Sequence, residues 1–172
     1  LNGASNQALS LLPGSSLWNL IAAGTGTVSA ASSLSVRGDF TVLAGQFLAG
    51  ASTHAIQGNF LVSSSATFSG QASTITLDGG AGGLSYQSVS FAGGGAFHGL
   101  NIAVSSVAFL TSATAQILTD AVAGSTLAVA GGSTLRVGDF RIGASSGAAA
   151  RLCSISSGAA WFLQVVAVSS VT

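Results

Sequence analysis

The sequence reads GDFTV at residues 38–42, GNFLV at residues 58–62 and GDFRI at residues 138–142. These stretches share the pattern Gly-[Asp/Asn]-Phe-x-[Val/Ile] and are separated by 20 residues or by a multiple of 20. A fixed period of this size is typical of one small structural unit stacked many times. The residues that we predict to form the turns and the core of this repeat are Gly38, Asp39, Phe40, Gly58, Asn59, Phe60, Gly138, Asp139 and Phe140.

Within each period, apolar residues alternate with small or polar ones, as in Leu34-x-Val36 and Ile75-x-Leu77. An alternation with a period of two indicates β-strands. Gly-Asp, Gly-Asn and Asp-Gly-Gly steps predict turns, where Gly supplies a positive φ and Asn or Asp hydrogen-bonds its own backbone. We therefore predict an all-β fold, a parallel β-solenoid of about eight coils of roughly 20 residues. It should form a single domain over residues 1–172, as a segment of a longer chain or as a filament subunit.

Two apolar columns appear when the chain is read in steps of 20 residues. The first contains the three motifs, so Phe40 should stack directly on Phe60. The Gly-rich stretch 79–95 should hold a turn that loops out of the coil. The second column, half a period away, contains Val28, Phe47, Leu48, Phe68, Val89, Phe109, Leu127, Val129 and Val168.

The composition excludes several classes of protein. Charged residues make up 5% of the chain, against about 25% in an average protein. The hydrophobic content of 48% argues against a disordered linker. A net charge of zero provides no basic surface for nucleic acid, and no apolar run approaches the roughly 18 residues that span a membrane. We expect neither a nucleic-acid partner nor membrane insertion.

Four stretches resemble the repeats of large bacterial surface and secreted β-helix proteins, such as filamentous-haemagglutinin-like adhesins and autotransporter passengers. They are SLSVRGDFTVLAGQFLAG (33–50), IQGNFLVSSSATFSG (56–70), FHGLNIAVSSVAF (97–109) and STLAVAGGSTLRVGDF (125–140). The resemblance implies a right-handed parallel β-helix, a secreted or cell-surface location, and a surface, adhesive or filament role. It implies no functional residues, because the motif that the family shares is structural.

The sequence contains little material for catalysis. GASSG at residues 143–147 matches the G-x-S-x-G nucleophile elbow, but no His follows His98 and no Asp follows Asp139, so the triad cannot follow in its usual order. A Walker phosphate loop needs Lys, which the chain lacks, so Gly79 to Gly83 is interpreted as a turn. His54 and His98 fall at different phases of the repeat. We predict no enzyme activity, no cofactor and no metal.

Two motifs near the turns allow more than one interpretation. Arg37-Gly38-Asp39 is the tripeptide that integrins recognise, but the repeat already places Gly and Asp at this turn. Asp39, Asn59 and Asp78 fall at nearly the same phase of successive coils. We interpret them as a ladder of turn-capping side chains; a calcium site is the alternative.

The remaining candidates are aromatic, sulfur or threonine side chains. Trp18, Trp161 and Tyr86 could stack on sugars, but such residues more often cover a core. Cys153 is expected to be a small buried side chain. Ice-binding solenoids have regular Thr rows, whereas here Thr74, Thr114 and Thr134 share a column that Gly94 interrupts.

Neither end of the sequence contains the charged or polar cap that usually protects a solenoid. We therefore predict a structural extracellular β-solenoid that self-associates, head to tail or laterally, into a filament, sheath or surface fibre. The alternative is an adhesin-type binding module that contacts a glycan or a host surface. An ice-binding protein is a third, weaker interpretation.

Overall fold

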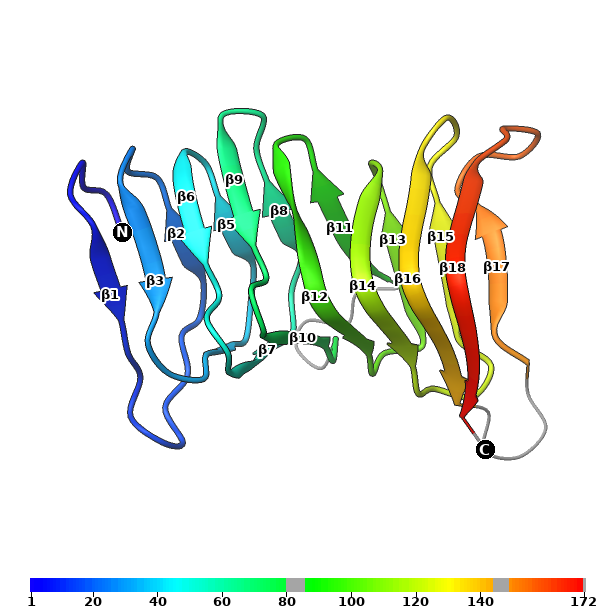
Figure 1. The fold of residues 1–172 in the computed structure, drawn as a ribbon, viewed down its shortest axis with the longest axis horizontal. Coiled ribbons are helices and arrows are strands. Elements are labelled where there is room, and N and C mark those ends of the chain that lie inside the picture. The colour runs from blue at the N-terminus through cyan, green and yellow to red at the C-terminus, as the bar shows by residue number, and fades with distance from the viewer. Residues whose placement is uncertain (80–85, 144–148, 172) are drawn as a thin grey trace.

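The fold is a stack of parallel strands wound into a solenoid (Figure 1). The computed structural model describes residues 1–79, 86–143 and 149–171, and in this part of the chain every regular element is a β-strand. All strand pairs are parallel. The predicted parallel β-solenoid is confirmed. The predicted number of eight coils is wrong, because the chain makes about six turns of about 21 residues.

One face of the solenoid is a seven-stranded sheet, which lies at the back in Figure 1. Neighbouring strands in this sheet are one turn of the chain apart, so its seven strands are separated by six turns. In chain order the strands are β2 (Leu20–Ala22), β5 (Phe40–Val42), β8 (Phe60–Val62), β11 (Gln87–Phe91), β13 (Ser106–Phe109), β15 (Thr126–Val129) and β17 (Arg151–Ser154).

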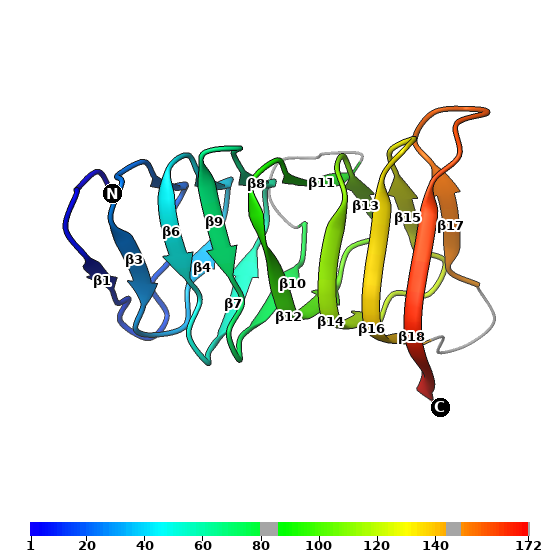
Figure 2. The same ribbon diagram turned by 45° about the horizontal axis from the view of Figure 1, so that its top comes forward.

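The rest of the solenoid is an eleven-stranded sheet that begins as two separate rows of short strands. The strand β12 (Gly94–Ile102) pairs with both rows and joins them, and one long strand per turn follows it (Figure 2). The first row is β1 (Gln7–Leu9), β3 (Thr27–Ala30), β6 (Gly45–Leu48) and β9 (Ala66–Ser69). The second row is β4 (Ser35–Val36), β7 (Thr53–Ile56) and β10 (Thr74–Leu77). The long strands after β12 are β14 (Ala113–Asp120), β16 (Thr134–Gly143) and β18 (Phe162–Val171).

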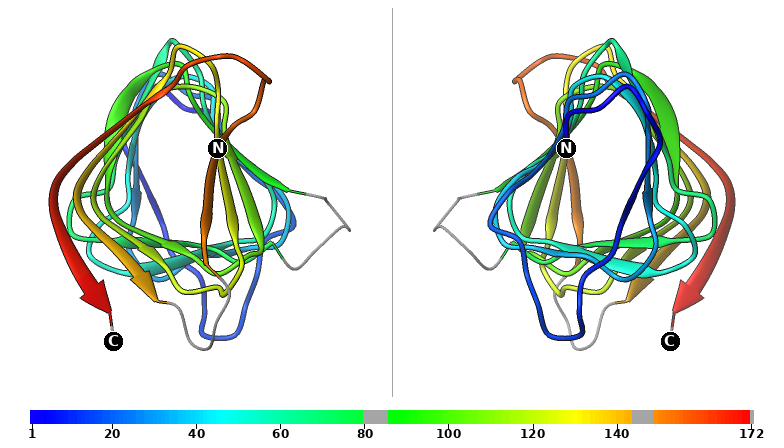
Figure 3. Two further views of the ribbon diagram at one scale, coloured as in Figure 1. Left: turned by 90° about the vertical axis from the view of Figure 1, so that its right-hand side faces the viewer. Right: turned by 90° about the vertical axis from the view of Figure 1, so that its left-hand side faces the viewer.

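The coil is right-handed. In the left view of Figure 3 the C-terminal end faces the viewer, and the chain winds counterclockwise as it advances towards that end. Right-handed crossovers between parallel strands are the rule, because the twist of a strand carries the chain back onto the sheet in that sense.

The core is one continuous cluster of inward-facing side chains. Phe40 pairs in register with Phe60, and their rings stack with centroids 4.8 Å apart and planes 15° apart, which confirms the predicted aromatic stack. Phe47 stacks in the same way on Phe68. Because identical side chains lie one strand spacing apart, each turn presents the next with a surface of matching shape.

The predicted second apolar column is correct only over its first part. Val28, Phe47 and Phe68 do lie on neighbouring strands, but Val89 pairs with Phe60 of the other column. Phe60 and Val89 are in register although 29 residues separate them, against 20 between Phe40 and Phe60. The turn predicted to loop out of the coil within 79–95 falls in part on residues 80–85, including Gly82 and Gly83, which lie outside the described residues. The extra residues move the later sequence by about half a period, so a constant step of 20 joined two different columns.

The same shift separates the third motif from the first two. Phe140 lies in β16 of the eleven-stranded sheet, where it pairs in register with Leu118, whereas Phe40 and Phe60 lie in the seven-stranded sheet. All three rings are buried. The motif therefore predicts an inward-facing Phe, but it does not predict which column that Phe occupies.

The aromatic core provides a first test. Phe60 contacts the rings of four other Phe residues, so we expect Phe60→Ala to lower the free energy of unfolding by about 3–5 kcal/mol. Its neighbour Leu61 points outwards and is 37% exposed, so Leu61→Ala should change stability by about 0.5 kcal/mol or less. Urea denaturation measures both. Similar losses for the two variants would contradict the inward stacking.

Candidate functional site

A ladder of polar side chains runs along one corner of the solenoid, just before the seven-stranded sheet. Asn19 Oδ1 accepts a hydrogen bond from the backbone N–H of Asp39 at 2.7 Å, and Asp39 Oδ1 accepts one from the N–H of Asn59, also at 2.7 Å. Asn59 Oδ1 accepts from the N–H of Ser88 at 3.0 Å and from its hydroxyl at 2.6 Å. Each side chain thus satisfies the backbone of the next turn.

This arrangement confirms a ladder of turn-capping side chains for Asp39 and Asn59 but corrects its composition. Asp78, which the spacing placed in the ladder, follows β10 on another side of the coil, and Ser88 occupies the expected position. The ladder also differs from the predicted turn chemistry, because these oxygens bind the adjacent turn and not their own backbone.

The glycines of the ladder are required by close approach and not by backbone conformation. Neither Gly38 nor Gly58 has a positive φ, although the sequence predicted one. A Cβ added to Gly38 would lie 2.1 Å from Asn19 Oδ1, and one added to Gly58 would lie 2.4 Å from the backbone of Gly38. The turns therefore stack backbone on backbone at this corner. A positive φ, of 48°, does occur at Gly79, which follows β10.

The Arg37-Gly38-Asp39 tripeptide lies on this corner with both charged side chains exposed. Asp39 already accepts the hydrogen bond from Asn59, so the turn itself accounts for the carboxylate. Asp39 is the only acidic member of the ladder, because its neighbours are Asn19, Asn59 and Ser88. One carboxylate is a weak basis for a calcium site, which usually has several oxygen ligands of this kind.

Substitutions at Asp39 test the role of the ladder. Asp39→Ala removes the acceptor for the N–H of Asn59, so the free energy of unfolding should fall by about 1 kcal/mol. Asp39→Asn keeps an oxygen acceptor and removes the charge, so stability should stay close to that of the original chain. Thermal and urea denaturation with and without calcium provide the comparison. A loss in Asp39→Asn that equals the loss in Asp39→Ala would show that the charge itself matters.

The third motif has a different polar environment. Asp139 forms an ion pair with Arg141, in which Nη2 and Nε of the arginine each lie 2.8 Å from Asp139 Oδ2. A Cβ added to Gly138 would lie 2.5 Å from the carbonyl oxygen of Gln116, so close approach again explains the glycine. The motif thus retains its glycine requirement and its buried Phe, but not the ladder.

His54 is buried inside the solenoid and hydrogen-bonded on both ring nitrogens. Its Nδ1 accepts from the N–H of Leu34 at 3.1 Å, and its Nε2 lies 2.7 Å from the carbonyl oxygen of Ala49, to which it donates. This pattern requires the neutral ring. Burial lowers the pKa of His54 from 6.5, against a smaller opposing effect of the hydrogen bond to Ala49.

His54 should make stability depend on pH. Because its pKa is lower in the folded than in the unfolded chain, the stability it provides is complete above about pH 6.5 and is lost as the pH falls below that value towards the folded pKa. His54→Gln keeps one acceptor and one donor but does not titrate. We expect urea denaturation between about pH 7.5 and 5.5 to show a smaller loss for His54→Gln than for the original chain. Equal losses would contradict this role.

The polar groups that could support catalysis are dispersed. Among the described residues, no three His, Cys, Asp or Glu side chains lie close enough together to hold a metal ion. The G-x-S-x-G match falls mainly on residues 144–147, which lie outside the described residues. Gly79 lies two residues after the end of β10, and Gly80 to Gly83, the rest of the stretch interpreted as a turn, lie outside the described part of the chain.

Two buried polar side chains were not anticipated from the sequence. Asp120 is fully buried at the end of β14, where it accepts hydrogen bonds from the hydroxyl of Ser125 and, at 3.3 Å, from the N–H of Val122. Gln87 donates through Nε2 to the carbonyl oxygens of Ile56, at 2.8 Å, and Gly58. Both lie next to turns, and their role is to satisfy buried backbone or hydroxyl groups.

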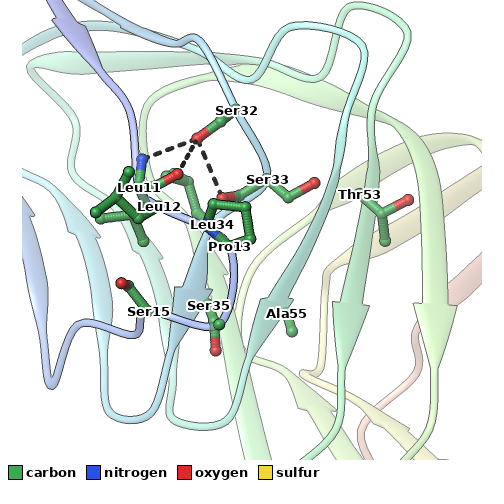
Figure 4. A pocket seen from close by; sticks show the side chains of 11 residues that line it. Leu11, Leu12, Pro13, Ser15, Ser32, Ser33, Leu34, Ser35, Thr53 and Ala55 are labelled. Atoms are coloured by element: carbon green, nitrogen blue, oxygen red, sulfur yellow. Dashed lines mark hydrogen bonds between the residues drawn. The ribbon is translucent and has the colours of Figure 1, made fainter.

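A hollow of about 540 Å³ lies beside the edge strand β4, under the segment from Leu11 to Ser15 (Figure 4). The hydroxyl of Ser32 ties this segment to the coil, since it accepts from the N–H of Leu11 at 2.9 Å and donates to the carbonyl oxygen of Leu11 at 3.3 Å. Leucine, proline and hydroxyl side chains make up most of the lining, and none of the lining residues is charged. The hollow therefore has no acid or base for chemistry.

The aromatic and sulfur candidates are mostly at the surface. Trp18 is 70% exposed and Tyr86 is 50% exposed, whereas Trp161 packs against the core near the C-terminal end. Cys153 was expected to be buried, but it is half-buried and pairs in register with the outward-facing Ala128. The prediction failed because Leu152 of β17 faces inwards, where it pairs in register with the buried Leu127. The alternation along the strand then turns the next residue, Cys153, outwards.

The predicted column of threonines does not exist. Thr74 pairs with Thr53 and Gly99, Thr114 pairs with Arg136, and Thr134 pairs with Phe162. The described outer surface therefore has no continuous Thr row through these positions.

Both ends of the solenoid present strand edges. Among the described residues, β18 and β17 each pair with one strand only, and so do β1 and β2. Beside these edges lie large exposed apolar side chains, which are Leu12, Trp18 and Ile21 at one end and Ile155, Phe162, Leu163 and Val166 at the other.

Comparisons of the chain with family models, with curated proteins and with solved structures found no match. The described residues contain no helix that is long and apolar enough to cross a membrane.

Proposed function

We propose that the chain is a structural segment of an extracellular β-solenoid, in which further copies add end to end to form a filament, sheath or surface fibre. The observation that carries the proposal is that β1 at one end, and β17 and β18 at the other, have no further strand beyond them among the described residues. The edge of β2 is covered in part by Leu1, whose amino group donates to the carbonyl oxygen of Ile21 at 2.7 Å and whose carbonyl oxygen accepts from the N–H of Ala23 at 2.8 Å. Natural proteins usually protect such edges with charged side chains, bulges or covering segments, since exposed edges recruit other strands. The ten-residue strand β18 contains no charged residue.

Each end of the solenoid presents an edge strand of each sheet. β1 and β18 belong to the eleven-stranded sheet, while β2 and β17 are the two edge strands of the seven-stranded sheet. A copy that docks head to tail could therefore continue the eleven-stranded sheet with parallel strands, and it would continue the seven-stranded sheet by displacing Leu1 from the edge of β2. Such a contact is heterologous and does not close on itself, which is the geometry of a filament.

Charge does not oppose this contact. No charged side chain precedes Arg37, and the net charge of the chain is zero, so copies repel each other little. The apolar side chains beside the edges would lose their contact with water on docking, which provides the driving force. Further coils of a longer chain could cover the same edges in the same way.

The test is association of the purified 172-residue chain, followed by sedimentation velocity over a range of concentrations and by negative-stain electron microscopy. We expect particles that grow with concentration and appear as filaments of uniform width. Val166 is 79% exposed in β18, so Val166→Lys should leave the fold intact and place a charge on the edge that suppresses growth.

Leu110→Lys is the matched control. Leu110 is 44% exposed between β13 and β14, and β15 separates β13 from the edge strand β17, so this variant should form filaments as the original chain does. A chain that stays monomeric at every concentration, or filaments that form equally well with Val166→Lys, would rule out end-to-end association through β18.

A second candidate function is an adhesin-type binding module. The observation that favours it is a polar hollow on the outer surface near β12, which a purely structural rod does not need. Its geometry supports a specific ligand class, as argued next.

A further inference from the structure

A hollow of about 500 Å³ interrupts the outer face of the eleven-stranded sheet where β12 joins the two rows. We call it the β12 notch. Its polar lining side chains include Gln46, Thr67, Gln71, His98 and Gln116, and its floor includes the backbone of Gly94 and Gly95.

The notch exists because two glycines follow each other at the start of β12. In the row of outward-facing positions, Gln46 pairs with Thr67 and Thr67 pairs with Gly94, so the third strand lacks the side chain that its neighbours have. Gly95 has a φ of +142° and a Cβ there would lie 2.0 Å from the carbonyl oxygen of Phe68. The strand packing therefore requires the glycine at 95, whereas Gly94 is exposed and an added Cβ would meet only Thr67 Cγ2, at 3.5 Å, so its backbone is left without a covering side chain.

The polar groups around the notch are free to bind. Among the described residues, the side chains of Gln46, Gln116 and His98 take part in no hydrogen bond, and both glutamines are exposed. Only Gln71 is engaged, since its Oε1 accepts from the N–H of Gly50 at 2.7 Å. Amide groups combine donor and acceptor within one planar unit, which suits neighbouring hydroxyl groups of a ligand.

The chemistry of the lining defines the ligand class. None of the lining residues carries a permanent charge, so an anionic or cationic ligand would lose hydration without gaining a partner. Residues from the four neighbouring strands β6, β9, β12 and β14 line the notch. The notch therefore extends across three strand spacings, or about 14 Å. We propose that the β12 notch binds a neutral oligosaccharide, with Gln46 and Gln116 hydrogen-bonding its hydroxyl groups and the glycine backbone contacting a sugar ring. This inference does not depend on end-to-end association.

Gly94 offers a variant that fills the notch without straining the fold. Its φ is not positive, and an added Cβ would meet only Thr67 Cγ2, at the ordinary contact distance of 3.5 Å. Gly94→Thr would continue the row of Thr67 with a residue that favours strands. The matched control is Leu61→Thr, which places the same side chain on the outer face of the seven-stranded sheet.

The experiment is saturation-transfer NMR on the full chain with cellotriose, maltotriose and triacetylchitotriose as probes, a method that also works if the protein forms filaments. We expect transfer to at least one trisaccharide, retained in Leu61→Thr and lowered roughly tenfold in affinity in Gly94→Thr. Gln116→Ala should weaken binding about three- to tenfold, the effect of a lost hydrogen bond. Circular dichroism and thermal melting verify that each variant is folded.

Two outcomes would overturn the proposal. One is the absence of transfer to all three trisaccharides. The other is binding that a folded Gly94→Thr variant retains at full strength, because the sugar would then bind elsewhere.

Discussion

The structure depends on the stacking of each turn on the equivalent part of the next at a single strand spacing. Parallel strands hold that spacing through backbone hydrogen bonds, and the inward side chains must then fit one another without adjustment. Identical or similar residues meet this requirement most simply, as Phe40 and Phe60 do. The six phenylalanines that form the densest part of this contact are Phe40, Phe47, Phe60, Phe68, Phe91 and Phe97.

Stacking fixes the register in space but does not fix the number of residues in a turn. Asn59 hydrogen-bonds Ser88, 29 residues later, in the same way that Asp39 hydrogen-bonds Asn59, 20 residues later. The strands before and after this longer turn keep their parallel pairing, as β10 does with β12 and β8 with β11. Buried contacts and the polar ladder therefore preserve the register across an insertion that breaks the sequence period.

This difference explains what the sequence could and could not predict. The alternation of apolar residues and the spacing of Phe40 and Phe60 were sufficient for the fold class and for the central stack. The position of Phe140, the number of turns and the composition of the ladder were not predictable by counting, because one long turn changes the phase of everything after it. The role of Gly38 was also hidden, since a glycine required for close approach and one required for a positive φ look the same in a sequence.

The same irregularity determines where this protein can have specificity. In a regular solenoid each outer row repeats a few side-chain types, and the surface is uniform along its length. At β12 the regularity ends, because two rows merge into one strand and Gly94 replaces the side chain that its row predicts. No contact with its neighbours requires a glycine at position 94, and Thr would fit there. The glycine leaves a hollow and does not improve the stability of the strand. Strand stability alone does not account for it, whereas a ligand that must approach the backbone would.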